Sequence, residues 1–283
     1  MSVNIVQTVL LLGIICVKNM FNMRLLHTGR KTEVKDMWVI RLAVTGLVLG
    51  LALLIGVLVH VVTWFVQRKD PGAALKMRSG YVRFALKAVW LATGAKAEVI
   101  GTENIPVDRA VLFIGNHRSL LDIVLAGKLI PVPVGFISKI ELEKVPILRL
   151  LMRDINCLFL DREDNRQGLK VILRAIELVK GGQSMFIFPE GTRSKQEGKL
   201  LPFHAGSFKV ATKAKAPIVP VTIVGTGDIL DDHFPKIKPA HTVIEFGKPI
   251  ETASLSRDEI KDLPDRVRNI IMETYERNRK LIR

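Results

Sequence analysis

The stretch AVLFIGNHRSLLD, residues 110–122, joins a short apolar run to the polar start of a helix. The run at 110–115 predicts a buried β-strand. Ser119, followed three residues later by Asp122, has the form of a capping box and places a helix start at Ser119. His117 is then expected in the turn at the carboxyl end of the strand, which is the edge where open α/β sheets bind ligands.

Short apolar runs alternate with helical stretches through the rest of the chain. We expect strands at 97–100, 110–115, 134–138, 155–160, 184–189, 218–225 and 242–247, and helices at 119–130, 165–181, 204–215 and 256–280. This alternation predicts one α/β domain over residues 95–283.

A long apolar segment precedes this domain. Residues 42–66 have Thr45, His60 and Thr63 as their only clearly polar members, which is enough helix to cross a hydrocarbon core of about 30 Å. Basic residues flank both ends, so we favour a helix that enters one leaflet and returns, with a spanning helix as the alternative. A core helix of a soluble protein is a third alternative, although such helices seldom lack a polar face over this length.

The stretch at 72–94 carries Lys76, Arg78, Arg83 and Lys87 among apolar residues, a pattern typical of a basic amphipathic helix at lipid headgroups. The alternative is a helix that packs on the domain with solvated lysines. Residues 37–94 are thus predicted to be membrane-associating helices.

The assignment of residues 1–36 as an N-terminal extension is open. The apolar run at 5–17 is too short to span and lacks the basic region of a signal peptide. An interfacial anchor is one interpretation, and a true start at Met20, Met23 or Met37 is the other.

The composition narrows the expected partners. A net charge of +15 beside 48% hydrophobic residues suits nucleic acid, anionic lipid or a phosphorylated substrate. Only 6% of residues are aromatic and no interleaved Arg/aromatic repeat appears, which argues against nucleic acid and favours an anionic phospholipid bilayer. Cys16 and Cys157 form no disulfide or metal-binding pattern, which predicts a reduced, cytosolic domain.

Polar groups follow four consecutive predicted strands. The bend after the first lets Asp122 reach His117, and a carboxylate that orients an imidazole creates a general base for a substrate hydroxyl. The strands at 134–138 and 155–160 are followed by Lys139 and Arg162. The strand at 184–189 runs into FPEGTRS, where glycine permits a tight turn and Arg193 offers a planar fork for phosphate. Each group alone is as well explained by a helix cap or a solvated turn, but their convergence on one edge predicts a phosphate-binding site.

In this order the blocks resemble the 1-acylglycerol-3-phosphate and glycerol-3-phosphate acyltransferases over about residues 95–225. The resemblance implies a single domain with a mixed, largely parallel sheet. NHRSLLD resembles the family's His-x-x-x-x-Asp block, which implies His117 as general base and Asp122 as its orienter. LFLDR, FPEGTRS and IVPV resemble the other blocks and imply Arg162, Glu190, Gly191 and Arg193 at the substrate phosphate, and Ile218, Val219 and Pro220 near the acyl chain.

The resemblance also implies the reaction and its partners. An acyl chain would pass from acyl-CoA or acyl carrier protein to the 2-hydroxyl of lysophosphatidic acid, giving phosphatidic acid without cofactor or metal. The catalytic domain would face the cytoplasm at the cell membrane. No G-x-S-x-G elbow for a nucleophilic serine is present. We expect a backbone N–H near the start of the helix at 119–130 to stabilise the oxyanion.

Four alternatives remain at this point. A metal hydrolase using His117, Asp122 and Glu190 lacks an H-E-x-x-H pattern and a third clustered histidine. A dinucleotide site at Gly225-Thr226-Gly227 lacks its third glycine, since Leu230 takes that place. A membrane-anchored lysolipid-binding protein would keep the fold without turnover, and an enzyme of this family could take glycerol 3-phosphate as acceptor.

Overall fold

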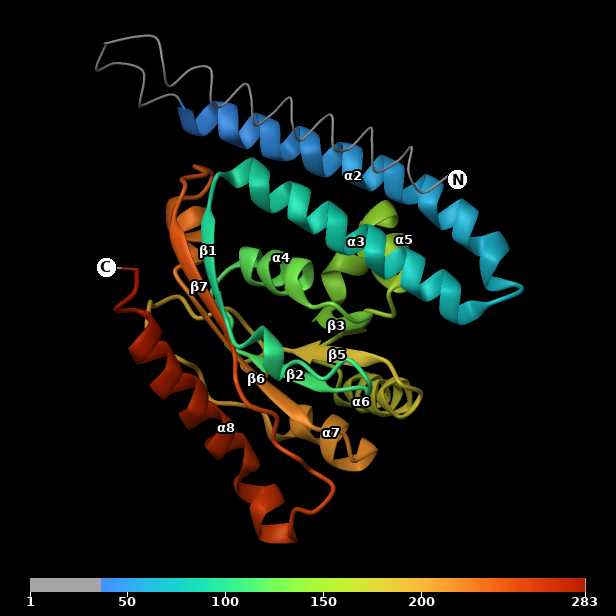
Figure 1. Cartoon of the computed structure of the whole chain (residues 1–283), viewed down its shortest axis with the longest axis vertical. Helices are drawn as coiled ribbons and strands as arrows, with labels where there is room; N and C mark the ends of the chain where they lie inside the picture. Colours follow the sequence, from blue (N-terminus) through green and yellow to red (C-terminus); the bar gives the residue numbers. More distant parts are fainter. Residues whose placement is uncertain (1–36, 283) are drawn as a thin grey trace.

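The computed structural model describes residues 37–282, so the N-terminal extension 1–36 and Cys16 lie outside the described residues. Within this range a sheet is flanked by helices and preceded by two long helices (Figure 1). The strands are β1 (Lys96–Ile100), β2 (Leu112–Gly115), β3 (Val134–Lys139), β4 (Leu158–Leu160), β5 (Ser184–Ile187), β6 (Ile218–Val224) and β7 (His241–Phe246). The α-helices are α2 (Met37–Gln67), α3 (Pro71–Thr93), α4 (Leu120–Leu129), α5 (Pro146–Asp154), α6 (Asn165–Lys180), α7 (Lys209–Ala214) and α8 (Arg257–Asn278). Short 3₁₀ turns are η1 (Thr102–Asn104), η2 (Ile140–Lys144), η3 (Ala205–Phe208), η4 (Gly227–Ile229) and η5 (Asp231–His233).

The sheet has seven strands in the order β1-β7-β6-β2-β5-β3-β4. Its one antiparallel pair is β6 with β7, and every other neighbouring pair is parallel. The predicted mixed, largely parallel sheet is confirmed. Because β2, β5, β3 and β4 are parallel neighbours, their carboxyl ends meet at one edge, as the convergence of polar strand ends requires.

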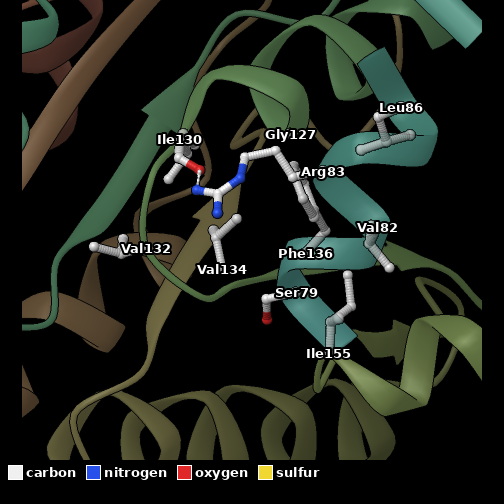
Figure 2. A pocket seen from close by; sticks show the side chains of 10 residues that line it. All are labelled: Ser79, Val82, Arg83, Leu86, Gly127, Ile130, Val132, Val134, Phe136 and Ile155. Atoms are coloured by element: carbon white, nitrogen blue, oxygen red, sulfur yellow. Dashed lines mark hydrogen bonds between the residues drawn. The ribbon is translucent and has the colours of Figure 1, made fainter. Parts of the chain in front are cut away.

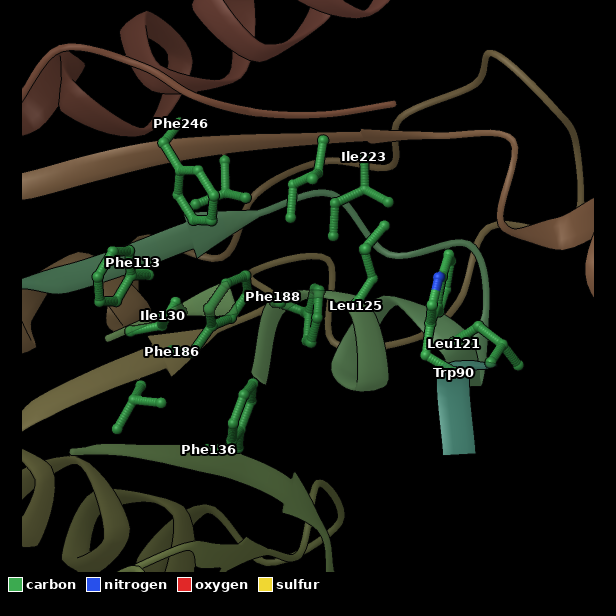
Figure 3. Close-up of a cluster of buried hydrophobic side chains, with 14 of the residues drawn as sticks. Trp90, Phe113, Leu121, Leu125, Ile130, Phe136, Phe186, Phe188, Ile223 and Phe246 are labelled. Atoms are coloured by element: carbon green, nitrogen blue, oxygen red, sulfur yellow. The ribbon is translucent and has the colours of Figure 1, made fainter. Parts of the chain in front are cut away.

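Apolar side chains fill both faces of the sheet. On the face covered by α3 and α4, aromatic rings line up across three strands (Figure 3). Phe186 of β5 lies 6.0 Å from Phe113 of β2 and 5.4 Å from Phe136 of β3, measured between ring centroids. On the other face, Val267 and Ile271 of α8 are fully buried. Burial on both faces explains why the strands show near-continuous apolar runs in the sequence.

Two regions differ from the prediction. β4 starts at Leu158 rather than at 155, because Asn156 adopts a left-handed φ of 56° and ends the preceding helix. That helix, α5, was not predicted; its first residue is Pro146, which is tolerated at a helix start because a proline there loses no hydrogen bond. The helix expected at 204–215 is the turn η3 followed by the short α7.

The apolar helix α2 runs alongside α3 and is the first arm of a helical hairpin (Figure 1). Among residues 37–282 it alone is long and apolar enough to cross a membrane, with a mean hydropathy of 2.8 in its most apolar window. Leu47, Leu54 and Leu58 are 63%, 60% and 66% exposed. Such exposure excludes the core-helix alternative, since a core helix buries its leucines.

A polar cluster fastens the hairpin to the α/β domain. His60 Nδ1 of α2 lies 2.8 Å from Asp154 Oδ2 at the end of α5. Arg78 of α3 is buried, and its Nε donates to Thr63 Oγ1 at 2.8 Å and lies 3.5 Å from Asp154 Oδ1. The three helices α2, α3 and α5 therefore meet at one polar cluster.

Helix α3 packs on the domain along much of its length. Lys76 and Lys87 are exposed, as a headgroup-facing helix requires, but Arg78 is buried and Arg83 Nη1 donates to the carbonyl of Pro131 at 2.6 Å. The two arginines therefore contact the protein, as in the alternative of a helix that packs on the domain with solvated lysines. Arg83 also borders an apolar pocket between α3, α4 and β3 (Figure 2), lined by Ser79, Val82, Leu86, Gly127, Ile130, Val132, Val134, Phe136 and Ile155.

Candidate active site

The turn between β2 and α4 brings His117 and Asp122 together. Ser119 caps α4 with both hydrogen bonds of the predicted capping box present. The chain bends before this cap, and His117 Nδ1 lies 2.9 Å from Asp122 Oδ2. Asp122 is fully buried, while the His117 side chain is 13% exposed.

Asp122 is held in place by donors on its own turn and in the segment that follows β6. Its Oδ2 accepts from the backbone N–H groups of Arg118 at 2.7 Å and Ser119 at 2.8 Å, and Oδ1 accepts from Thr226 Oγ1 at 2.5 Å. An ionised carboxylate only accepts hydrogen bonds, so His117 Nδ1 donates and Nε2 carries the lone pair. The imidazole is thus set as a base at Nε2.

The His117 ring is fixed from a second side. It stacks on Phe188 with centroids 4.0 Å apart and 18° between the ring planes. The turn borders a depression lined by Asn116, His117, Arg118, Glu190, Ser194, Gln196, Gly198, Lys199, Leu200 and Tyr275. This depression shares no lining residue with the apolar pocket at α3.

Glu190 joins the EGTRS loop to the His117 turn. Its Oε1 accepts from the backbone N–H of His117 at 2.7 Å and Oε2 from that of Leu201 at 2.8 Å, and the residue is 4% exposed. Burial raises the pKa of Glu190, while these two backbone hydrogen bonds oppose the rise. Ser194 N donates back to His117 O at 2.8 Å. Both carboxylate oxygens of Glu190 thus tie the loop to neighbouring backbone groups, and its predicted contact with the substrate phosphate stays a prediction.

Two predicted arginines lie along the same loop. Gly191 has φ of 70°, which favours glycine, and a Cβ there would lie 3.3 Å from the His204 ring and 4.0 Å from Arg162 Nε. Arg162 from the end of β4 therefore reaches the loop that follows β5. Arg193 is half-exposed, and its Nη1 pairs with Asp231 Oδ1.

The other predicted residues lie apart from this cluster. Lys139 ends β3, but its Nζ pairs with Glu141 at 2.5 Å in an exposed position. Ile218, Val219 and Pro220 are buried in β6, where they pair with β2. They line neither the depression nor the apolar pocket, so in this structure they support the strand that carries His117.

Other residues at the site were missed by the sequence interpretation. Arg118 pairs with Asp232 through Nη2, and its Nε lies 3.5 Å from Glu197 Oε2. Asp231 accepts from Ser119 Oγ. Glycines at 225 and 227 mark a turn after β6, which was a usable signal, but nothing local in the sequence shows that this turn returns to α4.

The expected oxyanion site at the start of α4 is wrong. The backbone N–H groups there already have acceptors: His117 N binds Glu190, Arg118 N and Ser119 N bind Asp122, Leu120 N binds Asp231, and Leu121 N binds Ser119 Oγ. Side-chain oxygens accept these hydrogen bonds, because a capping box engages the same backbone N–H groups that an oxyanion would need.

Neither a reactive thiol nor a metal cluster was found among residues 37–282. Burial raises the pKa of Cys157 to about 12, so this thiol stays protonated and unreactive. The described residues contain no group of three or more His, Cys, Asp or Glu that could hold a metal ion. A covalent acyl-cysteine step at Cys157 is therefore ruled out.

The region that carries these site residues is similar in sequence to known proteins. Residues 96–224 match a sequence family described as Acyltransferase. The chain is 32% identical over 186 residues to 1-acyl-sn-glycerol-3-phosphate acyltransferase of Saccharomyces cerevisiae, covering 65% of this chain and 61% of that protein. It is 32% identical to the probable 1-acyl-sn-glycerol-3-phosphate acyltransferase of Mycoplasma pneumoniae, covering 64% of this chain and 72% of that protein.

A solved structure extends the comparison to the helical hairpin. The crystal structure of the 1-acyl-sn-glycerophosphate acyltransferase PlsC from Thermotoga maritima superposes with a TM-score of 0.76 at 26% identity, covering 86% of this chain and 96% of that chain. Some relatives are longer. The chain spans 39% of the chloroplastic BAT2 acyltransferase of Brassica napus, to which it is 40% identical over 136 residues.

Proposed function

The chain belongs to the 1-acyl-sn-glycerol-3-phosphate acyltransferase family, and from this we propose that it transfers a fatty acyl chain to the 2-hydroxyl of 1-acyl-sn-glycerol 3-phosphate, forming phosphatidic acid. The acyl donor is a thioester of coenzyme A or of acyl carrier protein. The observation that carries the proposal is the imidazole of His117, which Asp122 holds at Nδ1 so that Nε2 is the basic nitrogen.

In the proposed reaction the acceptor oxygen attacks the thioester directly. His117 Nε2 removes the proton of the 2-hydroxyl as its oxygen bonds to the acyl carbon. The tetrahedral adduct then collapses, the carbon–sulfur bond breaks, and the imidazolium returns the proton to the departing thiolate. Asp122 stabilises the imidazolium throughout, as in other carboxylate–histidine pairs. No enzyme-bound acyl group forms, in keeping with the inert thiol of Cys157.

Arg162 and Arg193 are the proposed phosphate ligands. Arg193 lies on the loop that Glu190 ties to the His117 turn, and Arg162 reaches the same loop from the end of β4, so the phosphate would be bound at a fixed distance from the base. A guanidinium binds a phosphomonoester through paired N–H donors. Lys139, also predicted to bind phosphate, lies at the same edge of the sheet and is paired with Glu141, so its part would be long-range attraction.

We place the enzyme at the cell membrane with its α/β domain, residues 95–283, on the cytoplasmic face. The exposed leucines of α2, with Lys76 and Lys87 of α3, suit a helix pair at residues 37–94 that lies in one leaflet. The hairpin returns the chain to the side it came from, which favours this arrangement over a spanning helix.

The test is an assay of detergent-solubilised protein with a labelled acyl thioester, offered lysophosphatidate and glycerol 3-phosphate side by side. We expect labelled phosphatidate from the first acceptor and little product from the second. Preferred acylation of glycerol 3-phosphate would reassign the acceptor within the family. Bound lysophosphatidate without turnover would support a membrane-anchored binding protein instead, and loss of activity on chelation would support a metal enzyme.

A further inference from the structure

The segment after β6 contacts the site at three places, although it carries none of the blocks described above. Thr226 Oγ1 donates to Asp122, Asp231 pairs with Arg193, and Asp232 pairs with Arg118. Gly227 leaves room for this contact, because a Cβ there would lie 2.6 Å from Asp232 Oδ2 and 3.2 Å from Arg118 Cζ. The segment thus fits closely against both sides of the His117 turn.

Asp231 joins the start of α4 to Arg193 of the loop that follows β5. Its Oδ2 accepts from Ser119 Oγ and, at 3.3 Å, from Leu120 N at the start of α4, while Oδ1 pairs with Arg193. Its side chain is 11% exposed, whereas that of Arg193 is 44% exposed. A carboxylate at a helix N-terminus is stabilised by the helix dipole, so Asp231 is the fixed member of the pair.

We propose that Asp231 is a positioning residue that holds Arg193 next to the His117 turn, where the guanidinium binds the phosphate of the acceptor. This rests on the proposed function, since it concerns the phosphate of that substrate. Asp231 engages Nη1 of Arg193, and no further partner of this guanidinium is found in residues 37–282, so other N–H donors remain for a phosphate. Without Asp231, the long, half-exposed side chain of Arg193 would sample many rotamers. Fixing it in one rotamer on binding would cost conformational entropy and so weaken the binding of the acceptor.

The test is a double-mutant cycle on the steady-state constants for lysophosphatidate and acyl-CoA. Asp231→Ala should raise the acceptor KM about tenfold, a typical loss for one charge-assisted contact, with the donor KM unchanged and kcat within about threefold. Arg193→Ala should raise the acceptor KM similarly. The double variant should be no worse than Arg193→Ala, because Asp231 acts through that arginine.

Two further variants separate positioning from folding. Asp231→Asn keeps an acceptor oxygen and should recover part of the acceptor KM, while melting curves check that α4 is intact. Asp228→Ala removes an exposed carboxylate from the same segment and should leave the acceptor KM within about twofold, which controls for the change in charge.

The proposal would be overturned if the rise in acceptor KM of the double variant equalled the product of the two single rises. A fall in kcat at unchanged acceptor KM in Asp231→Ala would also overturn it. The latter would mean that Asp231 only stabilises the start of α4. Wild-type protein that fails to acylate lysophosphatidate would instead overturn the proposed function, and this inference with it.

Discussion

Two histidine–aspartate pairs of nearly equal length lie in different parts of this molecule. His117 and Asp122 meet at 2.9 Å at the edge of the sheet, and His60 and Asp154 meet at 2.8 Å beneath the helical hairpin. Both use Nδ1 of the imidazole. The distance between ring and carboxylate therefore does not distinguish a candidate base from a structural contact.

The surroundings of each carboxylate make the difference. Asp122 is held by backbone N–H groups of its own turn and by Thr226, so its position does not depend on a second cation. Asp154 also pairs with Arg78, which must be neutralised where it is buried. One pair orients an imidazole beside a depression, and the other compensates a buried charge.

The sharpest test of this contrast is to remove each imidazole. His117→Ala should lower kcat by a factor on the order of 10³ or more, because proton removal from the acceptor hydroxyl loses its base. His60→Ala is the matched control and should leave kcat within about threefold. Equal losses in the two variants, measured with lysophosphatidate in detergent, would remove the distinction.

The reverse experiment concerns stability. Asp154→Ala should lower the free energy of unfolding by about 3 kcal/mol, since Arg78 would stay buried without a counter-charge. Denaturant titration in detergent measures the loss. Asp265→Ala, at an exposed position of α8, should change stability by no more than about 0.5 kcal/mol. If Asp154→Ala lowered the free energy of unfolding by as little as Asp265→Ala, Arg78 would need no counter-charge.

A smaller effect on kcat is expected at Glu190, which links the loop after β5 to the turn after β2. Glu190→Gln should lower kcat about tenfold, because one of the two backbone donors, His117 N or Leu201 N, would face an amide nitrogen instead of an oxygen. Glu141→Gln alters an exposed carboxylate at the same edge of the sheet and should have little effect. Unchanged kcat in Glu190→Gln, with normal folding by circular dichroism, would mean that the loop needs no such tie.

The smallest effect should come from the hydroxyl behind Asp122. Thr226→Val removes one donor to Oδ1 and should lower kcat about threefold to tenfold, the cost of one lost hydrogen bond to a buried carboxylate. Thr252→Val removes a buried hydroxyl that binds the carbonyl of Ala216 away from the site. Measured against the wild type, kcat should fall in Thr226→Val and stay unchanged in Thr252→Val.

Local patterns predicted the sheet and the His117 turn, because both depend on residues that are close together in the sequence. The apolar runs are continuous, and Ser119 with Asp122 closes a box of four residues. Asp231 and Asp154 could not be predicted as partners, because they lie far along the chain from Ser119 and His60, and nothing nearby marks the contact. Glu190 was predicted in the polar loop after its strand, but its hydrogen bonds to the backbone of His117 and Leu201 depend on how two loops pack.

The pairing of β1 with β7 also affects the order in which the protein is made. Thr242 Oγ1 binds the carbonyl of Lys96, a residue 146 positions earlier, and β7 is the sheet neighbour of β1. During synthesis β1 therefore has no strand to join until almost the whole domain has left the ribosome. The apolar helix α2 emerges before that point, so it is available to a bilayer while the domain beside it is still incomplete.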